Sequence, residues 1–383
     1  MTLPLASDSI LYRLGAKPCI NAMGVYTSLG GSIISPTVWQ AMTESNETYV
    51  EMAPFMDGAG QMVADMLGAE AGRITPGASS AIALMVAACM TGADAARRER
   101  LPDTSGMPNE VLLQKGQRYL WDRMIRHPGA RIVEVGDGNG TTAAHLRDAI
   151  TPRTACVFYP AHLEASAGTL TLAECIAISR EGGVPILVDA AYMNYPTALM
   201  SSYTAAGADL VCFSAKYYAG PNTGGFIVGR RDLVEAVAAL DYYKTGDHRI
   251  YGRPFKLDRQ LVVGVVLALE EWLAMDHESR YADYRSKVDR LAAGIADVPG
   301  ITVEPACFTM EETFQSKPVN CLTVRPLPES GLSAADLDTR LRAGDPVIRA
   351  FVQPGFIAIV ATTLSEQDVE TVIARLREAC GAP

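Results

Sequence analysis

The segment F-S-A-K-Y-Y-A-G-P-N-T-G-G-F-I-V-G, residues 213–229, joins an apolar strand, a lysine, a glycine-rich turn and a second strand. Lys216 follows the first strand directly, an unusual place for a surface lysine. Burial against apolar neighbours lowers the pKa of an amine, and the neutral amine can then form a Schiff base. The alternative is a solvated lysine in a loop.

Two earlier segments carry complementary chemistry. In T-P-G-A-S-S-A-I, residues 75–82, a turn of small residues opens a helix, so that Ala78 and Ser79 offer N–H donors for a phosphate. A plain helix cap is the alternative there. In I-L-V-D-A-A-Y, residues 186–192, Asp189 ends an apolar strand, where α/β sheets bind ligands. Its carboxylate can pair with a protonated pyridine nitrogen or cap the next helix.

Short apolar runs alternate with helical patterns between residues 73 and 230, which predicts the α/β class with a mainly parallel sheet covered on both faces. The pattern predicts strands at 111–114, 131–135, 155–159, 186–188, 210–213 and 226–228. We expect an irregular N-terminal arm over 1–35, a large domain with a long connecting helix over 36–289, and a small α+β domain over 290–383.

Composition and residue patterns argue against several classes of function. The net charge of −10 over 383 residues argues against nucleic acid as a main partner. The N-terminus lacks a signal-peptide pattern, and the longest apolar run, 81–90, is about half of the ~20 residues that span a membrane. The eight scattered cysteines predict reduced thiols and a cytoplasmic location. The isolated histidines predict no metal site.

The three segments, in this order, resemble those of fold type I, aspartate aminotransferase-like enzymes that use pyridoxal 5′-phosphate. Within them the chain resembles the selenocysteine synthase (L-seryl-tRNA selenium transferase) group, and the resemblance runs from Ile20 to the C-terminus. The stretch 101–118 is still more similar to D-glucosaminate-6-phosphate ammonia-lyase-like members. The supporting motifs are I-N-A-M-G-V-Y-T-S-L-G-G (20–31), V-E-V-G (133–136) with G-T-T (140–142), and R-P-F-K-L-D-R (253–259).

The resemblance implies roles by position. Lys216 becomes the Schiff-base lysine and Asp189 the partner of the pyridine nitrogen. His162, in F-Y-P-A-H-L, lies against the cofactor ring, unless it is a core histidine. The other implied cofactor-binding residues are Gly77, Ala78, Ser79, Ala191, Ser214 and Gly224. The implied substrate-binding residues are Asn21, Tyr26, Arg253 and Lys256, with exposed surface charge as the alternative for the last two.

The implied reaction removes ammonia from a β-hydroxy amino acid, for which a phosphorylated sugar acid is one option. Lys216 takes the Cα proton, a group leaves Cβ with help from His162 or Tyr217, and a 2-oxo acid forms. The alternatives are a racemase or epimerase, an aminotransferase, and a non-enzymatic regulatory protein that binds the cofactor.

The resemblance also implies partners. We expect a small anionic substrate and a homo-oligomer, at least a dimer, in which the arm and the turn at 223–225 complete a neighbouring site. The selenocysteine synthases that use seryl-tRNA carry an extra N-terminal region. Because the motif here begins near residue 20, we expect no tRNA binding.

Overall fold

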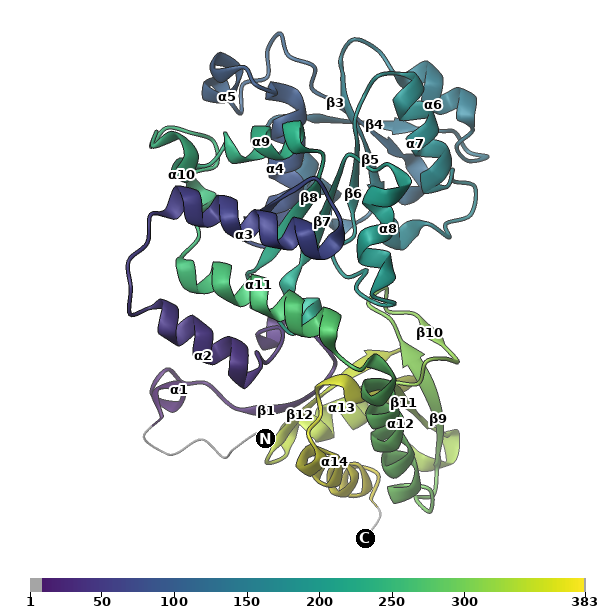
Figure 1. Cartoon of the computed structure of the whole chain (residues 1–383). Helices are drawn as coiled ribbons and strands as arrows, with labels where there is room; N and C mark the ends of the chain where they lie inside the picture. The colour runs from purple at the N-terminus through teal and green to yellow at the C-terminus, as the bar shows by residue number, and fades with distance from the viewer. Residues whose placement is uncertain (1–8, 382–383) are drawn as a thin grey trace. The chain divides into compact units, whose positions relative to one another are not determined.

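The computed structural model describes residues 9–381, which form two compact units (Figure 1). The larger unit is Ser32–Ala274. The smaller unit combines the described parts of Met1–Gly31 and Met275–Pro383. The boundary therefore falls earlier than residue 290, because the helix that begins at His277 buries Val288 and Leu291 in the core of the smaller unit.

The larger unit is built on a seven-stranded sheet in the order β2-β8-β7-β6-β5-β3-β4. Strand β8 is antiparallel to both of its neighbours, and all other pairs are parallel. The expected α/β class with a mainly parallel sheet is confirmed. The strands are β2 (Ala71–Thr75), β3 (Glu110–Gln114), β4 (Arg131–Val135), β5 (Thr154–Pro160), β6 (Ile186–Asp189), β7 (Leu210–Ser214) and β8 (Gly225–Gly229).

Helices cover both faces of this sheet. Because strand side chains alternate between the faces, Val211 and Phe213 of β7 enter one apolar cluster while Leu210 and Cys212 enter the other. Helices α3, α7, α8 and α11 contribute to the first cluster, and α4 and α9 to the second. The helices are α2 (Pro36–Ser45), α3 (Met52–Leu67), α4 (Ala78–Thr91), α5 (Ala95–Arg100), α6 (Ala143–Ala149), α7 (Leu172–Glu181), α8 (Ala198–Ala206), α9 (Arg231–Ala238), α10 (Tyr242–Thr245) and α11 (Arg259–Ala274).

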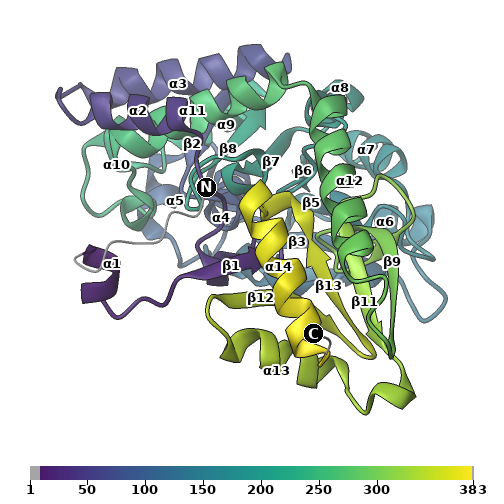
Figure 2. The ribbon, with the colours of Figure 1, turned by 90° about the horizontal axis from the view of Figure 1, so that it is seen from below.

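The smaller unit contains a six-stranded sheet in the order β1-β12-β13-β11-β9-β10. Helices α12, α13 and α14 pack on one face of it (Figure 2). The strands are β1 (Cys19–Ala22), β9 (Ile301–Phe308), β10 (Phe314–Gln315), β11 (Cys321–Pro326), β12 (Val347–Gln353) and β13 (Phe356–Val360). The helices are α1 (Ile10–Arg13), α12 (His277–Gly294), α13 (Ala334–Ala343) and α14 (Glu366–Ala379).

Residues 1–8 of the N-terminal arm lie outside the described residues, and the described part from Ser9 on contains more regular structure than its sequence predicts. Strand β1 lies parallel to β12, with Ile20 opposite Ile348 and Ala22 opposite Ala350. Burial of Ile20 and Ala22 in the smaller unit explains why this segment is a strand and not an irregular arm. Among the described residues, no helix has the length and apolar character needed to cross a membrane.

Candidate functional site

Four chemically active side chains follow neighbouring parallel strands of the larger unit. Tyr119 comes after β3, His162 after β5, Asp189 ends β6, and Lys216 comes after β7. The carboxyl ends of parallel strands meet at one edge of the sheet, where α/β proteins bind ligands. The structure thus brings Lys216, Asp189 and His162, which were singled out from the sequence, to the same edge.

Aromatic contacts connect these strand ends. The ring centroid of His162 lies 5.0 Å from that of Tyr119 and 5.3 Å from that of Tyr192. Tyr192 lies 5.7 Å from Tyr217, and the Lys216 Nζ stands 4.7 Å from the centroid of the Tyr217 ring. We refer to Tyr119, His162, Asp189, Tyr192, Lys216 and Tyr217 as the Lys216 cluster.

Asp189 is the buried acid of this cluster, with 4% of its surface exposed. Its carboxylate accepts hydrogen bonds from the Tyr119 hydroxyl and, at 3.0 Å, from the Ala191 N–H. Burial raises the pKa of Asp189, and the hydrogen bond from Tyr119 is the largest effect that lowers it. The next helix, α8, has Thr197 at its N-cap. Asp189 is therefore not a helix cap, the alternative that the sequence left open.

Lys216 lies in a short 3-10 turn, Ala215–Tyr218, and is partly buried. Desolvation by burial lowers the pKa of its amine, the direction that favours a neutral nucleophile or base. Ala219 ends the turn at φ +60°, a left-handed conformation that is strained for a residue with a Cβ atom. The structure thus holds Lys216 in a tight turn at the sheet edge and not in a solvated loop.

The glycine-rich turn after Lys216 packs closely on both sides. The Gly224 carbonyl accepts the Ala215 N–H at 2.9 Å. A Cβ atom on Gly224 would come within 2.4 Å of Val265 in α11. Gly224, expected to bind cofactor, therefore has at least a packing role, because no larger residue fits there.

The start of α4 lies beside this turn. A Cβ atom on Gly225 would approach the Gly77 Cα to 2.9 Å, so β8 and the start of α4 are in backbone contact. Gly77 is the N-cap of α4, and a glycine offers no side chain to the first N–H groups of the helix. Ala78 and Ser79 occupy the first two helical positions, and Ser79 is exposed. Such a helix start can hold a phosphate.

The remaining predicted cofactor residues lie close to Asp189 and Lys216. Ser214 is the last residue of β7, and its N–H donates to the Ala191 carbonyl at 2.9 Å. Ala191 in turn donates its N–H to Asp189. The groups of this site fit pyridoxal phosphate, because they include a buried carboxylate, an amine of lowered pKa and an open helix start. These are the partners that a pyridine nitrogen, an aldehyde and a phosphate require.

Asn21 and Tyr26 lie in the smaller unit, where both take part in local structure. The Asn21 side chain donates to the Gly24 carbonyl at 3.0 Å and accepts the Met23 N–H at 3.0 Å. The Tyr26 hydroxyl donates to Glu312 at 3.0 Å. These contacts account for their positions in the turn after β1, and their expected substrate role stays a prediction.

Arg253 and Lys256 lie on the segment between α10 and α11. The Arg253 guanidinium stands 5.1 Å from the ring centroid of Tyr242, and Lys256 is exposed. Within the described residues, no polar contact joins either side chain to the Lys216 cluster. Their expected substrate role also stays a prediction.

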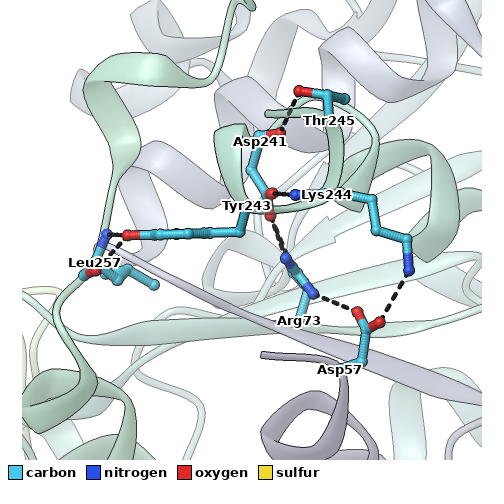
Figure 3. Close-up of polar contacts among 7 residues, drawn as sticks. All are labelled: Asp57, Arg73, Asp241, Tyr243, Lys244, Thr245 and Leu257. Carbon is cyan, nitrogen blue, oxygen red and sulfur yellow. Dashed lines mark hydrogen bonds and ion pairs between the residues drawn. The ribbon is translucent and has the colours of Figure 1, made fainter. Parts of the chain in front are cut away.

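An ion network centred on the buried Arg73 anchors this segment to the sheet (Figure 3). Arg73 of β2, almost fully buried, pairs with Asp57 of α3 and with Asp241, which precedes α10. Lys244 of α10 also pairs with Asp57 at 2.9 Å. At the far end, the Tyr243 hydroxyl accepts the Leu257 N–H at 2.6 Å and donates to the Leu257 carbonyl.

Tyr119 was missed from the sequence, although it carries a direct hydrogen bond to Asp189. The motif quoted above for this region, 101–118, ends one residue before it. The usable signal was its position, since Tyr119 follows a parallel strand just as His162 and Lys216 do. From the sequence, Gly225 was named only as part of an intersubunit turn. Its contact partner Gly77 is separated from it by about 150 residues along the chain, too far for an argument from local spacing to predict the contact.

Comparisons with known proteins agree with this geometry. The family model for SelA, L-seryl-tRNA selenium transferase, matches residues 19–243. A 5′-C-glycyluridine monooxygenase-decarboxylase from Streptomyces sp is 35% identical, over 96% of this chain and 90% of the relative. A D-glucosaminate-6-phosphate ammonia lyase from Salmonella typhimurium (strain 14028s / SGSC 2262) is 32% identical, over 97% and 98%.

A solved structure extends the match to three dimensions. The structure of D-glucosaminate-6-phosphate ammonia-lyase superposes with a TM-score of 0.84 at 31% identity, covering 98% of this chain and 99% of that chain. The family resemblance and the fold expected from the sequence are confirmed. The chain belongs to the L-seryl-tRNA selenium transferase family and has the fold type I of pyridoxal phosphate-dependent enzymes.

Proposed function

We propose that the protein is a pyridoxal phosphate-dependent lyase that releases ammonia from a β-hydroxy amino acid. One observation carries this proposal: an amine of lowered pKa and a buried carboxylate follow adjacent strands of a fold that the ammonia lyase shares. Bound pyridoxal phosphate would supply an electron-withdrawing ring joined to the substrate amine.

Lys216 and Asp189 act on two different protons, the one on the substrate Cα and the one on the ring nitrogen. The Lys216 Nζ takes the proton from Cα, and burial lowers the pKa of this amine, the direction that favours the neutral form that a base requires. The Asp189 carboxylate holds a proton on the ring nitrogen, which makes the ring a stronger electron acceptor. His162, which contacts both Tyr119 and Tyr192, would lie against the ring.

Departure of hydroxide from Cβ needs an acid. Burial and the charge of Asp189 raise the pKa of Tyr217 to about 12, so this hydroxyl remains protonated at neutral pH and can donate. His162 is the other candidate donor. The Cβ–O bond breaks and water leaves. Hydrolysis of the remaining C–N bond consumes one water, so the overall products are a 2-oxo acid and ammonia.

The name of one relative supports an anionic substrate. The ammonia lyase relative is named for a phosphorylated sugar acid. We propose that Arg253 and Lys256 serve such a substrate, with Asn21 and Tyr26 as further contacts.

A second candidate function follows from the Streptomyces relative, which shares 35% of its residues with this chain. Its name implies oxygen-dependent loss of carbon dioxide from an amino acid. That chemistry also needs an amine-bearing substrate joined to the cofactor and activated at Cα. It differs from the lyase reaction by consuming O₂.

A panel assay separates the two candidates. Purified protein loaded with cofactor would be given D- and L-β-hydroxy amino acids, including phosphorylated amino sugar acids, under nitrogen and under air. We expect one enantiomer to release ammonia and 2-oxo acid in equal amounts in both atmospheres. Release of carbon dioxide only under air would replace the lyase with the monooxygenase-decarboxylase. Racemised substrate or a transferred amino group would indicate a racemase or an aminotransferase.

The lysine assignment has its own test. Borohydride reduction of the loaded protein, followed by peptide mass spectrometry, should place the cofactor on Lys216. Lys216→Ala should lose the lysine-linked visible absorbance and lower turnover by about 100- to 10,000-fold, the usual contribution of a positioned base. Cofactor on another lysine would overturn the assignment.

A further inference from the structure

The Asp189 carboxylate accepts hydrogen bonds from three groups, one of which is the Tyr119 hydroxyl. The Tyr119 hydroxyl donates to Asp189 Oδ2, while the Ala191 N–H and, at 3.8 Å, the Cys212 thiol donate to Oδ1. An ionised carboxylate has about four acceptor positions. Three are therefore occupied and one remains for the ring nitrogen of the cofactor.

Tyr119 is a donor that cannot change its role. Burial and the neighbouring charge of Asp189 raise the pKa of the Tyr119 hydroxyl far above its usual value of 10.0, so this group stays protonated at neutral pH. A hydroxyl that always donates favours the ionised form of the acid that accepts its hydrogen bond. At Asp189 this effect opposes the burial that favours the neutral form.

Tyr119 is itself held in place from two sides. Its N–H donates to Asp122 at 3.2 Å, and Asp122 is buried and paired with Arg118. Its ring meets the edge of His162 at an interplanar angle of 66°. The hydroxyl thus reaches Asp189 from a fixed backbone and a packed ring, the arrangement that a precise site requires.

We propose that Tyr119 is a positioning residue that holds Asp189 ionised and in one orientation, so that the carboxylate keeps the proton on the cofactor ring nitrogen. This role rests on the proposed pairing of Asp189 with that nitrogen. Without the hydroxyl, the shared proton shifts toward Asp189 and the ring becomes a weaker electron acceptor. Substrate binding does not need the hydroxyl, so turnover should fall while KM changes little.

Tyr119→Phe tests this role, because it removes the hydroxyl and keeps the ring against His162. Tyr203→Phe is the matched control, since Tyr203 is a buried tyrosine of α8 in the same unit and lies outside the Lys216 cluster. Each protein would be loaded with cofactor labelled with ¹⁵N in its ring. The nitrogen chemical shift, the cofactor affinity, kcat and KM would then be measured.

For Tyr119→Phe we expect the nitrogen signal to move toward the unprotonated position and kcat to fall by about 10- to 100-fold, the loss expected from one hydrogen bond to a charged group. KM should stay within about threefold, and Tyr203→Phe should match the wild type. A Tyr119→Phe protein with the wild-type nitrogen signal and kcat overturns the proposal.

A graded substitution covers the case in which Tyr119→Phe does not fold. A fluorinated tyrosine at position 119 is a stronger donor, so the ring nitrogen should stay protonated to a higher pH than in the wild type. An unchanged pH midpoint of the nitrogen signal overturns the role of Tyr119 alone. An unprotonated nitrogen in the wild type overturns the proposed pairing of Asp189 as well, which distinguishes the two failures.

Discussion

Asp189 lies where an ionised side chain is costly without its partner. It is almost fully buried, and the hydrogen bonds from Tyr119 and Ala191 offset the lost hydration only in part, so its pKa remains raised. Functional acids of this kind lower the stability of the protein that carries them. The same burial makes the carboxylate a strong partner for a cation that enters the site.

Asp189→Asn should separate stability from activity. The folded pKa of Asp189 lies above its unfolded value of about 3.9, so the cofactor-free wild type loses stability as the pH rises between these two values, whereas the Asn variant does not. We expect the cofactor-free variant to be at least as stable as the wild type at pH 8, and its relative advantage to be smaller at pH 4. Urea unfolding at both pH values measures this.

The catalytic activity of Asp189→Asn, unlike its stability, should fall. Breaking a buried charge pair costs about 3 kcal/mol or more, which corresponds to a loss of kcat of at least roughly 100-fold. An Asn variant that is less stable at pH 8, or one that keeps wild-type turnover, would show that Asp189 is a structural acid.

At the scale of elements, Arg73 connects three parts of the larger unit. It stands in the middle of β2 and joins α3 to the start of α10 through Asp57 and Asp241. The segment that follows α10, which carries Arg253 and Lys256, is closed at Leu257 by Tyr243. The network therefore fixes both ends of a segment that has little regular structure of its own.

Arg73→Ala should destabilise the protein by about 3 kcal/mol, because it removes an almost fully buried cation and leaves the partly buried Asp241 without its ion-pair partner. The control is Arg147→Ala, which removes the exposed pair with Glu181 and should cost less than about 1 kcal/mol. The midpoints of urea unfolding compare the two. Equal losses would mean that the Arg73 network contributes no more than a surface ion pair.

The elements that the sequence predicts well are those with local signals. Strand β4 has the predicted limits, because the short run I-V-E-V marks it, and a Thr171 capping box marks the start of helix α7. Strand β2 was missed, since Arg73 interrupts its apolar pattern and only its ion network explains that residue. Strand β1 was missed because its partner, β12, lies more than 300 residues away along the chain.

The residues of the site also separate into those with a local signal in the sequence and those without one. Lys216 and Asp189 could be found because each stands at or just after the end of an apolar strand in the printed sequence, and His162 because the family resemblance implies it. Tyr119 could not be assigned to Asp189, because that contact depends on which strands are neighbours in the sheet. The roles of Ser79, Ser214 and the two cations on the segment before α11 stay predictions.

At the scale of the whole molecule, we propose a homo-oligomer, at least a dimer. The family resemblance implies that the arm and the turn at 223–225 complete a neighbouring site. The larger unit also exposes large apolar side chains on and around α2, with Trp39 exposed by 59% and Tyr49 by 93%. Helix α2 buries only Val38 fully. Exposed apolar groups in this number often mark a surface that another chain covers.

Analytical ultracentrifugation at micromolar concentration should show a dimer or a larger assembly. Trp39→Glu should shift the distribution toward the monomer, because it places a charge on the apolar surface. Met275→Glu, at a separate exposed apolar residue, should not change it. An active wild-type monomer would contradict the proposal.

The antiparallel insertion of β8 has a consequence during synthesis. In the sheet, β2 pairs only with β8, so its partner is made last among the strands of the larger unit. Roughly 150 residues must be added after β2, which takes on the order of 10–30 s at a ribosome. During that time β2, with α3 packed against it, has no neighbouring strand that joins it to the sheet. The nascent chain is therefore expected to need a chaperone until residue 229 has left the exit tunnel, and only then can Lys216 and Gly77 lie at the same edge.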